Sequence, residues 1–128
     1  MSADSDPVPP TSEVVALYGA AWQEPGEDAR RALLERAWAE DGVYVDPTVV
    51  VRGREALVAH LGGFQERMRD HSLVLTTGVD ERLGWLRFGW NLLAPDGELV
   101  LEGQDFGELD GDGRLRLIVG FFGPAAPA

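Results

Sequence analysis

From about residue 72 onward, the spacing of the apolar residues changes from mainly helical to extended, and this change limits the folds that the chain can adopt. Before residue 72, apolar residues recur at the three- and four-residue spacing of amphipathic helices. After it, extended runs at 72–79, 82–94, 98–109 and 114–122 are separated by "DE", "PDG" and "DGDG", which indicate hairpins. Helices grouped ahead of a four-strand antiparallel meander are typical of an α+β domain, in which helices cover one face of a sheet.

Two helices are predicted at the start of the helical half. Thr11 and Ser12 suit the N-cap of the first helix, and the Pro-Gly pair at 25–26 ends it. The second helix begins after this pair with two acidic residues, which favour a helix N-terminus, and its apolar stripe runs to Trp38. Gly42 is then predicted to end it.

A short hairpin and a third helix follow. The hairpin strands are predicted at Val43–Asp46 and Val49–Arg52, and Gly53 precedes the helix. One side of that helix carries Leu57, His60, Leu61, Phe64 and Met68. His60 is therefore expected to lie within an apolar stripe.

The length and the two ends of the chain indicate one domain. With 128 residues the chain can form one hydrophobic core but not two. The opening "MSADSDPVPPTS" has neither a basic start nor an apolar stretch, so we expect a disordered leader over 1–11 and no signal peptide. The domain is expected over 12–122, with a flexible tail at 123–128. Without a targeting segment, a cytoplasmic location is expected.

The charge and the missing residue types exclude several functions. A formal net charge of −11 disfavours nucleic acid and anionic membranes as partners, because both require a basic face. No apolar run approaches the roughly 20 residues of a membrane helix. All eleven basic residues are Arg, and there is no Lys or Cys, which excludes Schiff-base chemistry on a lysine and thiol nucleophiles.

A metal or another cofactor is not expected. The two His residues, His60 and His71, are far apart in the sequence, and no other residues show the spacing of metal ligands. The segment "DGDG" at 110–113 lacks the further oxygen ligands of a calcium loop, so it is interpreted as a hairpin turn.

Asp105 is a charged residue on the apolar face of a predicted strand. In the run 98–109, this face carries Leu99, Leu101, Gly103, Asp105, Gly107 and Leu109. Full burial raises the pKa of a carboxyl group by as much as ~3–5 units, and a protonated acid can donate a hydrogen bond in an active site. The alternative is a structural Asp at a sheet bulge, satisfied by backbone donors.

The neighbouring strands carry apolar and aromatic side chains that could line a pocket. The even positions of the run 82–94 include the apolar residues Leu86, Phe88, Trp90 and Leu92, and one parity of the last strand includes Ile118 and Phe122. Aromatic side chains around a few inward carboxylates are typical of small-molecule pockets. The alternative is that these side chains form only a core. Both faces of the last strand become apolar toward its end, so one is expected to pack on helices and the other on a partner subunit.

Three segments together carry a family resemblance. They are "AWAEDGVYVDP", "VRGREALVAHL" and "LEGQDFGELDGDGRL". In their order and spacing, residues 12–122 resemble the SnoaL-like and ketosteroid-isomerase-like branch of the nuclear-transport-factor-2-like superfamily. The resemblance implies three helices packed on a strongly curved, mostly antiparallel sheet that forms a cone with an internal apolar pocket.

The resemblance also implies roles for two acids. The acid before a proline that serves as the general base in the isomerases corresponds to Asp46, and the protonated acid of their oxyanion hole corresponds to Asp105. Their oxyanion tyrosine corresponds to a position near Ala20–Trp22, where this chain has no tyrosine. Tyr18 is the nearest, up to one helical turn away.

Further residues are expected around this pair. His60 corresponds to a helix position that points into the pocket, where it would serve as a second acid–base group; the alternative is a core His bonded to a backbone carbonyl. The catalytic candidates are thus Asp46, Asp105, Tyr18 and His60. The residues expected to bind the substrate are Trp22, Tyr44, Phe64, Leu86, Phe88, Trp90, Ile118 and Phe122.

These residues are compatible with two functions from different classes. The first is an enzyme that transfers protons on a small apolar organic molecule, as in isomerisation, cyclisation or epoxide opening. The second is a non-catalytic module of the same fold that binds a ligand or only dimerises. A homodimer formed through the outer face of the sheet is compatible with both.

Overall fold

The computed structural model describes residues 9–128, and the elements named here lie in that range. The helices are α1 (Thr11–Gln23), α2 (Glu27–Ala37) and α3 (Arg54–Arg67). The strands are β1 (Trp38–Asp46), β2 (Val49–Arg52), β3 (Ser72–Leu75), β4 (Asp80–Arg82), β5 (Trp85–Leu93), β6 (Leu99–Leu109) and β7 (Leu115–Phe122). Most of the predicted leader, residues 1–8, lies outside the described residues. Within the described part, no helix is both long and apolar enough to span a membrane.

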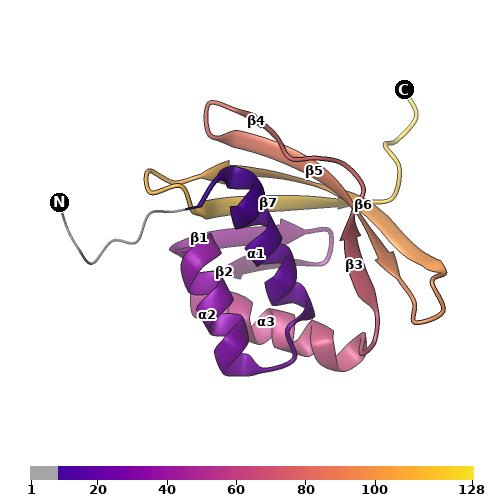
Figure 1. The fold of residues 1–128 in the computed structure, drawn as a ribbon. Helices are drawn as coiled ribbons and strands as arrows, with labels where there is room; N and C mark the ends of the chain where they lie inside the picture. Colours follow the sequence, from indigo (N-terminus) through magenta and orange to yellow (C-terminus); the bar gives the residue numbers. More distant parts are fainter. Residues whose placement is uncertain (1–8) are drawn as a thin grey trace.

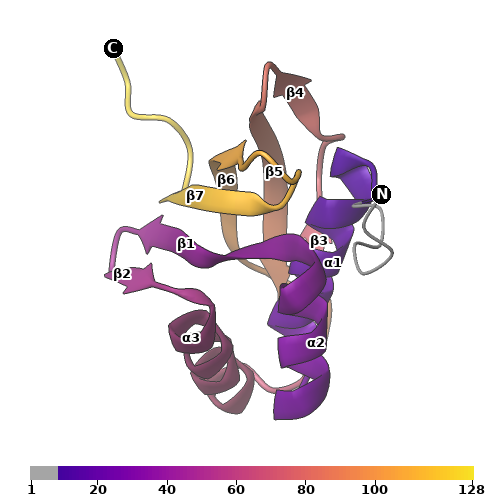
Figure 2. The same ribbon diagram turned by 90° about the vertical axis from the view of Figure 1, so that its left-hand side faces the viewer.

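The seven strands form one mixed sheet. Its order is β2-β1-β7-β6-β5-β3, with β4 paired to the first residues of β5 and β3 to its last. Only the β1–β7 pair is parallel among these pairings; the others are antiparallel. Figures 1 and 2 show the three helices together on one side of the sheet, whose strands curve around them. The predicted α+β class and the curved, mostly antiparallel sheet are therefore confirmed.

The turn between α1 and α2 follows the predicted Pro-Gly break, and a buried arginine fixes it. Arg30 is only 4% exposed, and its guanidinium donates to the carbonyl oxygens of Glu24, Pro25 and Val58. These bonds join the turn to α3, because Val58 belongs to that helix. Burial of this cation is tolerated because three carbonyl groups accept its hydrogen bonds.

The predicted start of α1 is wrong by one position. Pro10 is the N-cap, and its carbonyl oxygen accepts the N–H groups of Glu13 and Val14. Thr11 is already helical, and its hydroxyl donates to Glu81 of β4 at 2.7 Å instead of capping the helix.

The predicted end of α2 is also wrong. The helix ends at Ala37, β1 begins at Trp38, and Gly42 lies inside that strand. Trp38 is fully buried and stacks on Tyr18, with ring centroids 5.5 Å apart. A side chain on Gly42 would overlap the Trp38 indole, and the pairing register of β1 with β7 shifts between Trp38 and Val43. Gly42 therefore leaves room for the indole at an irregularity of the strand. In the sequence, a glycine at this place has the same appearance as one that ends a helix.

The second half of the chain contains one more strand than predicted. The first run ends at Leu75, and the "DE" pair belongs to β4 instead of forming a turn. The turn is formed by Leu83 and Gly84, which both have positive φ angles, of 53° and 86°. The "DGDG" turn is confirmed, since the Asp110 carboxylate accepts backbone N–H groups within it.

The faces of β7 follow the predicted parity only beyond its centre. Leu115 and Ile118 are both fully buried, although they differ in parity. The pairing register of β6 with β7 shifts between Glu108 and Leu109, which turns the start of β7. Gly120 is buried on the side of Ile118, whereas Phe121 is 56% exposed on the outer face.

Candidate active site

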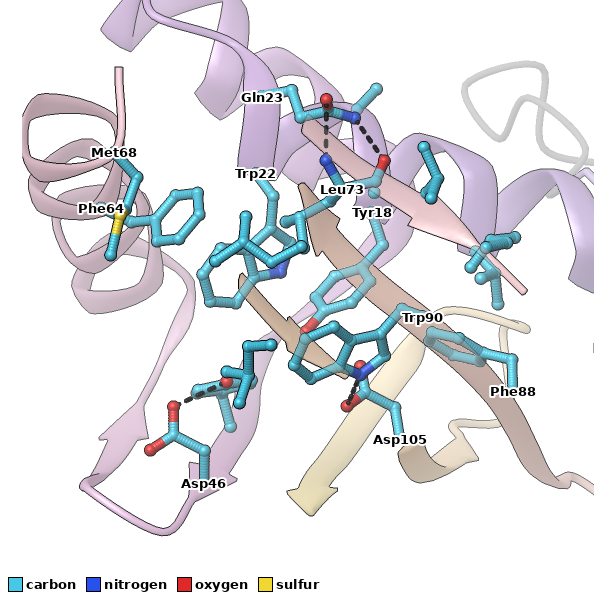
Figure 3. Close-up of a pocket in the computed structure, with 18 of the residues that line it drawn as sticks. Tyr18, Trp22, Gln23, Asp46, Phe64, Met68, Leu73, Phe88, Trp90 and Asp105 are labelled. Carbon is cyan, nitrogen blue, oxygen red and sulfur yellow. Dashed lines mark hydrogen bonds between the residues drawn. The ribbon is translucent and has the colours of Figure 1, made fainter. Parts of the chain in front are cut away.

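A cavity of about 590 Å³ lies between the helices and the inner face of the sheet (Figure 3). All four candidate catalytic residues line it, together with most of the predicted substrate-binding residues. From the predicted set, the lining residues are Tyr18, Trp22, Tyr44, Asp46, His60, Phe64, Phe88, Trp90, Asp105 and Phe122. The fold thus brings α1, α3, β1, β5, β6 and β7 together around one largely apolar space.

Asp105 lies on the inner face of β6 and is only 6% exposed. Its Oδ1 accepts a hydrogen bond from the Trp90 indole N–H at 3.0 Å. Burial raises the pKa of Asp105 to about 7; the Trp90 bond acts against this rise, and the negative charge of Asp46 adds to it. Near neutral pH, a large fraction of Asp105 is therefore protonated and able to donate a hydrogen bond.

Asp46 ends β1 and is partly exposed at the edge of the cavity. Its Oδ1 accepts the backbone N–H and the hydroxyl of Thr48, both at 2.7 Å, and its Oδ2 accepts the Tyr44 hydroxyl at 2.8 Å. Burial acts to raise the pKa of Asp46, but the bonds from Thr48 and Tyr44 and the charge of His60 outweigh it and lower that pKa. Asp46 is therefore ionised at neutral pH.

Gly120, which has no side chain, lies between the two acids in the sheet. Gly120 of β7 pairs with Asp105 and lies between β6 and β1 in the sheet. A Cβ atom on Gly120 would lie 3.0 Å from Asp105 Oδ1, 3.7 Å from Asp46 Cβ and 3.8 Å from the Tyr44 hydroxyl. The Asp105 carboxyl group, the Tyr44 hydroxyl and the Cβ of Asp46 therefore lie around the inner side of Gly120, where a side chain would crowd Asp105.

The Tyr18 hydroxyl points into the same cavity without a partner. Tyr18 is 2% exposed, and its hydroxyl has no hydrogen bond with any residue of the described range. Burial raises the pKa of Tyr18 well above its ordinary value, and the negative charge of Asp105 adds to the rise. The phenol stays neutral, so it is a free donor. A buried polar group of this kind needs a partner, and a ligand in the cavity can supply it.

Comparison with known proteins identifies the family. No family model matches the chain, and no curated protein matches it. Its structure matches a candidate isomerase of the SnoaL-like family from Agrobacterium tumefaciens strain C58, with 33% identity and a TM-score of 0.82, over 88% of this chain and 96% of that one. The chain belongs to the SnoaL-like family.

Two further solved structures share the fold of this SnoaL-like chain. One is a nuclear-transport-factor-2-like protein of unknown function from Exiguobacterium sp. 255-15, with 15% identity, a TM-score of 0.70 and coverage of 88% and 99% of the two chains. The other is a candidate SnoaL-like polyketide cyclase from Jannaschia sp. CCS1, with 16% identity, a TM-score of 0.65 and coverage of 94% and 91%. These two likenesses show the fold alone, and the predicted SnoaL-like branch is confirmed by the Agrobacterium protein.

His60 lies at the wall of the cavity of this SnoaL-like domain, beside two aromatic rings that also contact each other. Its ring centroid is 5.7 Å from that of Tyr44 and 6.0 Å from that of Trp22. Burial lowers the pKa of His60; the charge of Asp46 acts against this, and that of Arg67 adds to it. The imidazole is therefore mainly neutral at pH 7, as a proton acceptor requires.

Two of the predicted substrate-binding residues do not line the cavity. Leu86 is 4% exposed and Ile118 is fully buried, and both belong to the hydrophobic core. Leu86 lies near the far end of β5, opposite Gly107 of β6. A Cβ atom on Gly107 would lie 2.8 Å from Ile118 Cδ1, so the Ile118 side chain fills the space over that glycine.

Sequence reasoning missed several residues that shape the site of this SnoaL-like domain. Thr48 supplies two of the three hydrogen bonds to Asp46, and the spacing Asp-Pro-Thr, typical of a turn closed by the Asp side chain, could have predicted it. Gln23 lines the cavity and exchanges two hydrogen bonds with the backbone of Leu73 (Figure 3). No local signal predicts that contact. Across residues 9–128, no group of three or more His, Cys, Asp or Glu side chains is placed to hold a metal ion.

Proposed function

We propose that this SnoaL-like protein is an acid–base enzyme for an apolar organic molecule that carries one hydrogen-bond-accepting oxygen. Isomerisation, cyclisation and epoxide opening are reactions of this type. The observation that carries the proposal is that two unlike acids, ionised Asp46 and partly protonated Asp105, line one largely apolar cavity. Carboxyl groups whose pKa values are driven apart are suited to separate acid and base roles.

In the proposed mechanism, Asp46 takes or relays a proton of the substrate. Negative charge then develops on the accepting oxygen, where Asp105 and the free Tyr18 hydroxyl donate hydrogen bonds. A positioned acid or base typically contributes about 10²–10⁴-fold in rate, and one donor to a developing oxyanion about 10²–10³-fold. His60 is a second proton acceptor beside Asp46.

The names of the similar proteins support the substrate class. The Agrobacterium protein is described as a candidate isomerase and the Jannaschia protein as a candidate polyketide cyclase. Both descriptions imply a small organic substrate. A cavity of about 590 Å³ accommodates such a molecule.

Turnover measurements on variants test the proposal. A panel of apolar ketones, enones and epoxides is screened with the wild-type protein, and the confirmed substrate is then used with Asp46→Asn, Asp105→Asn and Tyr18→Phe. We expect losses of kcat of at least about 10²-fold for both Asp variants. Asp41→Asn is the matched control, because Asp41 is an exposed acid of the same strand as Asp46. Unchanged turnover in both Asp variants contradicts the mechanism.

A ligand-binding role without catalysis is the second candidate. The observation that favours it is that the three hydrogen bonds to Asp46 already tie its carboxylate to the turn and to Tyr44. Following the carboxyl carbons of Asp46 and Asp105 by NMR against pH separates the two candidates. If both acids titrate near the ordinary value of about 4, the binding role is favoured.

A homodimer is proposed through the outer face of the sheet. Phe106 and Phe121 contact each other there, with ring centroids 5.7 Å apart, although they are 39% and 56% exposed. Val100, on the same face of β6, is 47% exposed. Exposed apolar side chains that gather on one face are typical of an interface. Sedimentation should show a dimer that Phe121→Glu dissociates; a wild-type protein that remains monomeric at high concentration contradicts this proposal.

A further inference from the structure

The Trp90 indole lies against Asp105, and its contact distinguishes the two carboxyl oxygens. The indole N–H donates to Oδ1 at 3.0 Å, as the dashed line in Figure 3 marks. We infer that Trp90 is a positioning residue for Asp105: it keeps Oδ1 as the accepting oxygen and leaves the acid proton to Oδ2. This inference rests on the proposed function, in which Asp105 donates a hydrogen bond to the substrate.

A glycine makes the contact possible. Trp90 of β5 pairs with Gly103 of β6, two residues before Asp105 on the same face. A Cβ atom on Gly103 would overlap the six-membered ring of the indole and would lie 2.7 Å from its Cε2. Since Gly103 has no side chain, the indole can lie over β6 and reach the carboxyl group.

A second aromatic ring holds the indole in this place. Phe122 of β7 pairs with Gly103 and contacts Trp90 at nearly a right angle, with ring centroids 5.8 Å apart. The indole is therefore fixed by packing as well as by its hydrogen bond. A carboxyl group held by such a neighbour keeps its orientation when the cavity is empty.

The chemistry of the indole determines which group donates in this hydrogen bond and which accepts. The indole N–H can only donate, so the oxygen that it contacts must be an acceptor. In a neutral carboxylic acid only the carbonyl oxygen accepts readily, which leaves the hydroxyl on the other oxygen. The Trp90 bond also favours the anion over the neutral acid, and it therefore opposes the rise of the Asp105 pKa that burial causes.

The other titratable groups around Asp105 come from three elements. Those that line the same cavity are Tyr18 of α1, Tyr44 and Asp46 of β1, and His60 and Arg67 of α3. The charge of Asp46 raises the pKa of Asp105. Trp90, in contrast, carries no charge and stabilises the anion through a single hydrogen bond. Its contribution can therefore be removed without changing the charge of the site.

Trp90→Phe tests the inference, because phenylalanine keeps an aromatic ring and removes the donor. The titration midpoint of the Asp105 carboxyl carbon, followed by NMR, should rise by about one pH unit, as expected for the loss of one hydrogen bond to an anion. Trp85→Phe is the matched control: Trp85 is on the same strand, is 55% exposed and should leave the midpoint unchanged. A midpoint that does not move in Trp90→Phe overturns the inference.

A measurement on the wild-type protein covers the case in which Trp90→Phe does not fold. The chain has four Trp residues, so each indole N–H resonance can be assigned. The Trp90 resonance should shift with pH at the Asp105 midpoint, and Asp105→Asn should abolish that shift. A Trp90 resonance that does not respond to pH overturns the inference. Neither measurement needs a substrate, so its result is distinct from a failure of the proposed catalysis, which only turnover reports.

Discussion

Asp46 and Asp105 are the same type of side chain in two different surroundings. Asp46 ends a strand, is partly exposed and accepts three hydrogen bonds. Asp105 lies within a strand, is 6% exposed, and accepts one hydrogen bond, from Trp90. The pKa of the first is lowered and that of the second is raised to about 7. The position of each acid along its strand thus accounts for the difference between their pKa values.

The backbone explains this difference. Within a sheet, the N–H groups beside Asp105 are already paired with neighbouring strands, so only side chains are left to donate to its carboxyl group. After the strand end at Asp46, the chain turns, and the N–H of Thr48 is free to donate. A turn therefore leaves backbone N–H groups free to donate to a carboxylate and keep it ionised, whereas in the interior of a strand these groups are already paired.

The largest expected effect is a fall in stability as pH rises, caused by Asp105. Its pKa is about 7 in the folded protein against an ordinary value of 3.8, so between these values the folded state holds a proton that the unfolded chain has released. This stabilisation is complete below about pH 4 and is lost as pH rises through 7. The loss is on the order of 4 kcal/mol. Urea denaturation from pH 4 to 8 measures it.

Two variants isolate this contribution from those of the other titrating groups. Asp105→Asn should lack it, so the stability difference between the variant and the wild type should change steadily in favour of the variant as pH rises. Asp46→Asn should show no such trend over this range, because the stabilisation that comes from the lowered pKa of Asp46 is complete above the ordinary value of 3.8 and is lost only as pH falls below it. Parallel pH profiles for wild type and Asp105→Asn would contradict the different surroundings inferred for the two acids.

Strand parity was sufficient to predict the inner position of Asp105, because a sheet fixes side-chain direction with a period of two. The same rule failed at the start of β7, where Leu115 is buried on account of a register shift. Such a shift depends on the partner strand, and no local pattern in β7 encodes it. Gly42 was misread for a related reason: its role is set by the Trp38 indole, which lies over it only in the folded sheet.

The site was predicted in part. The sequence and the family resemblance predict Asp46, Asp105, Tyr18 and His60 as candidate catalytic residues, and all four line one cavity. What the sequence does not show is how they are held. The Trp90 bond to Asp105 joins two strands across a glycine, and the position of Tyr18 depends on stacking against Trp38. These are tertiary contacts, which residue spacing does not specify.

A second, smaller effect is expected from closing the gap between the acids. Gly120→Ala places a methyl group 3.0 Å from Asp105 Oδ1, so the carboxyl group must shift. We expect a loss of about 1–3 kcal/mol in the free energy of unfolding, as for other overpacked interiors. Gly111→Ala is the control, since no atom lies within 4 Å of a Cβ at that position. Equal stability of the two variants in chemical denaturation would mean that the position at Gly120 is not enclosed by the acids.

The smallest expected effect concerns the donors to Asp46. Thr48→Val removes the hydroxyl donor and keeps the backbone N–H, so the pKa of Asp46 should rise, with a loss of about 1 kcal/mol in stability at pH 7. This loss should disappear as pH falls through the pKa of Asp46, because the neutral acid gains little from the hydroxyl.

A double-mutant cycle decides whether the loss arises from this contact. In the Asp46→Ala background, Thr48→Val should have little effect, because the hydroxyl no longer has a carboxylate to bond. An equal loss in both backgrounds would assign it to the packing of Thr48. Asp46 would then owe its low pKa mainly to the backbone N–H of Thr48 and to Tyr44, and the strand end alone would be enough to keep it ionised.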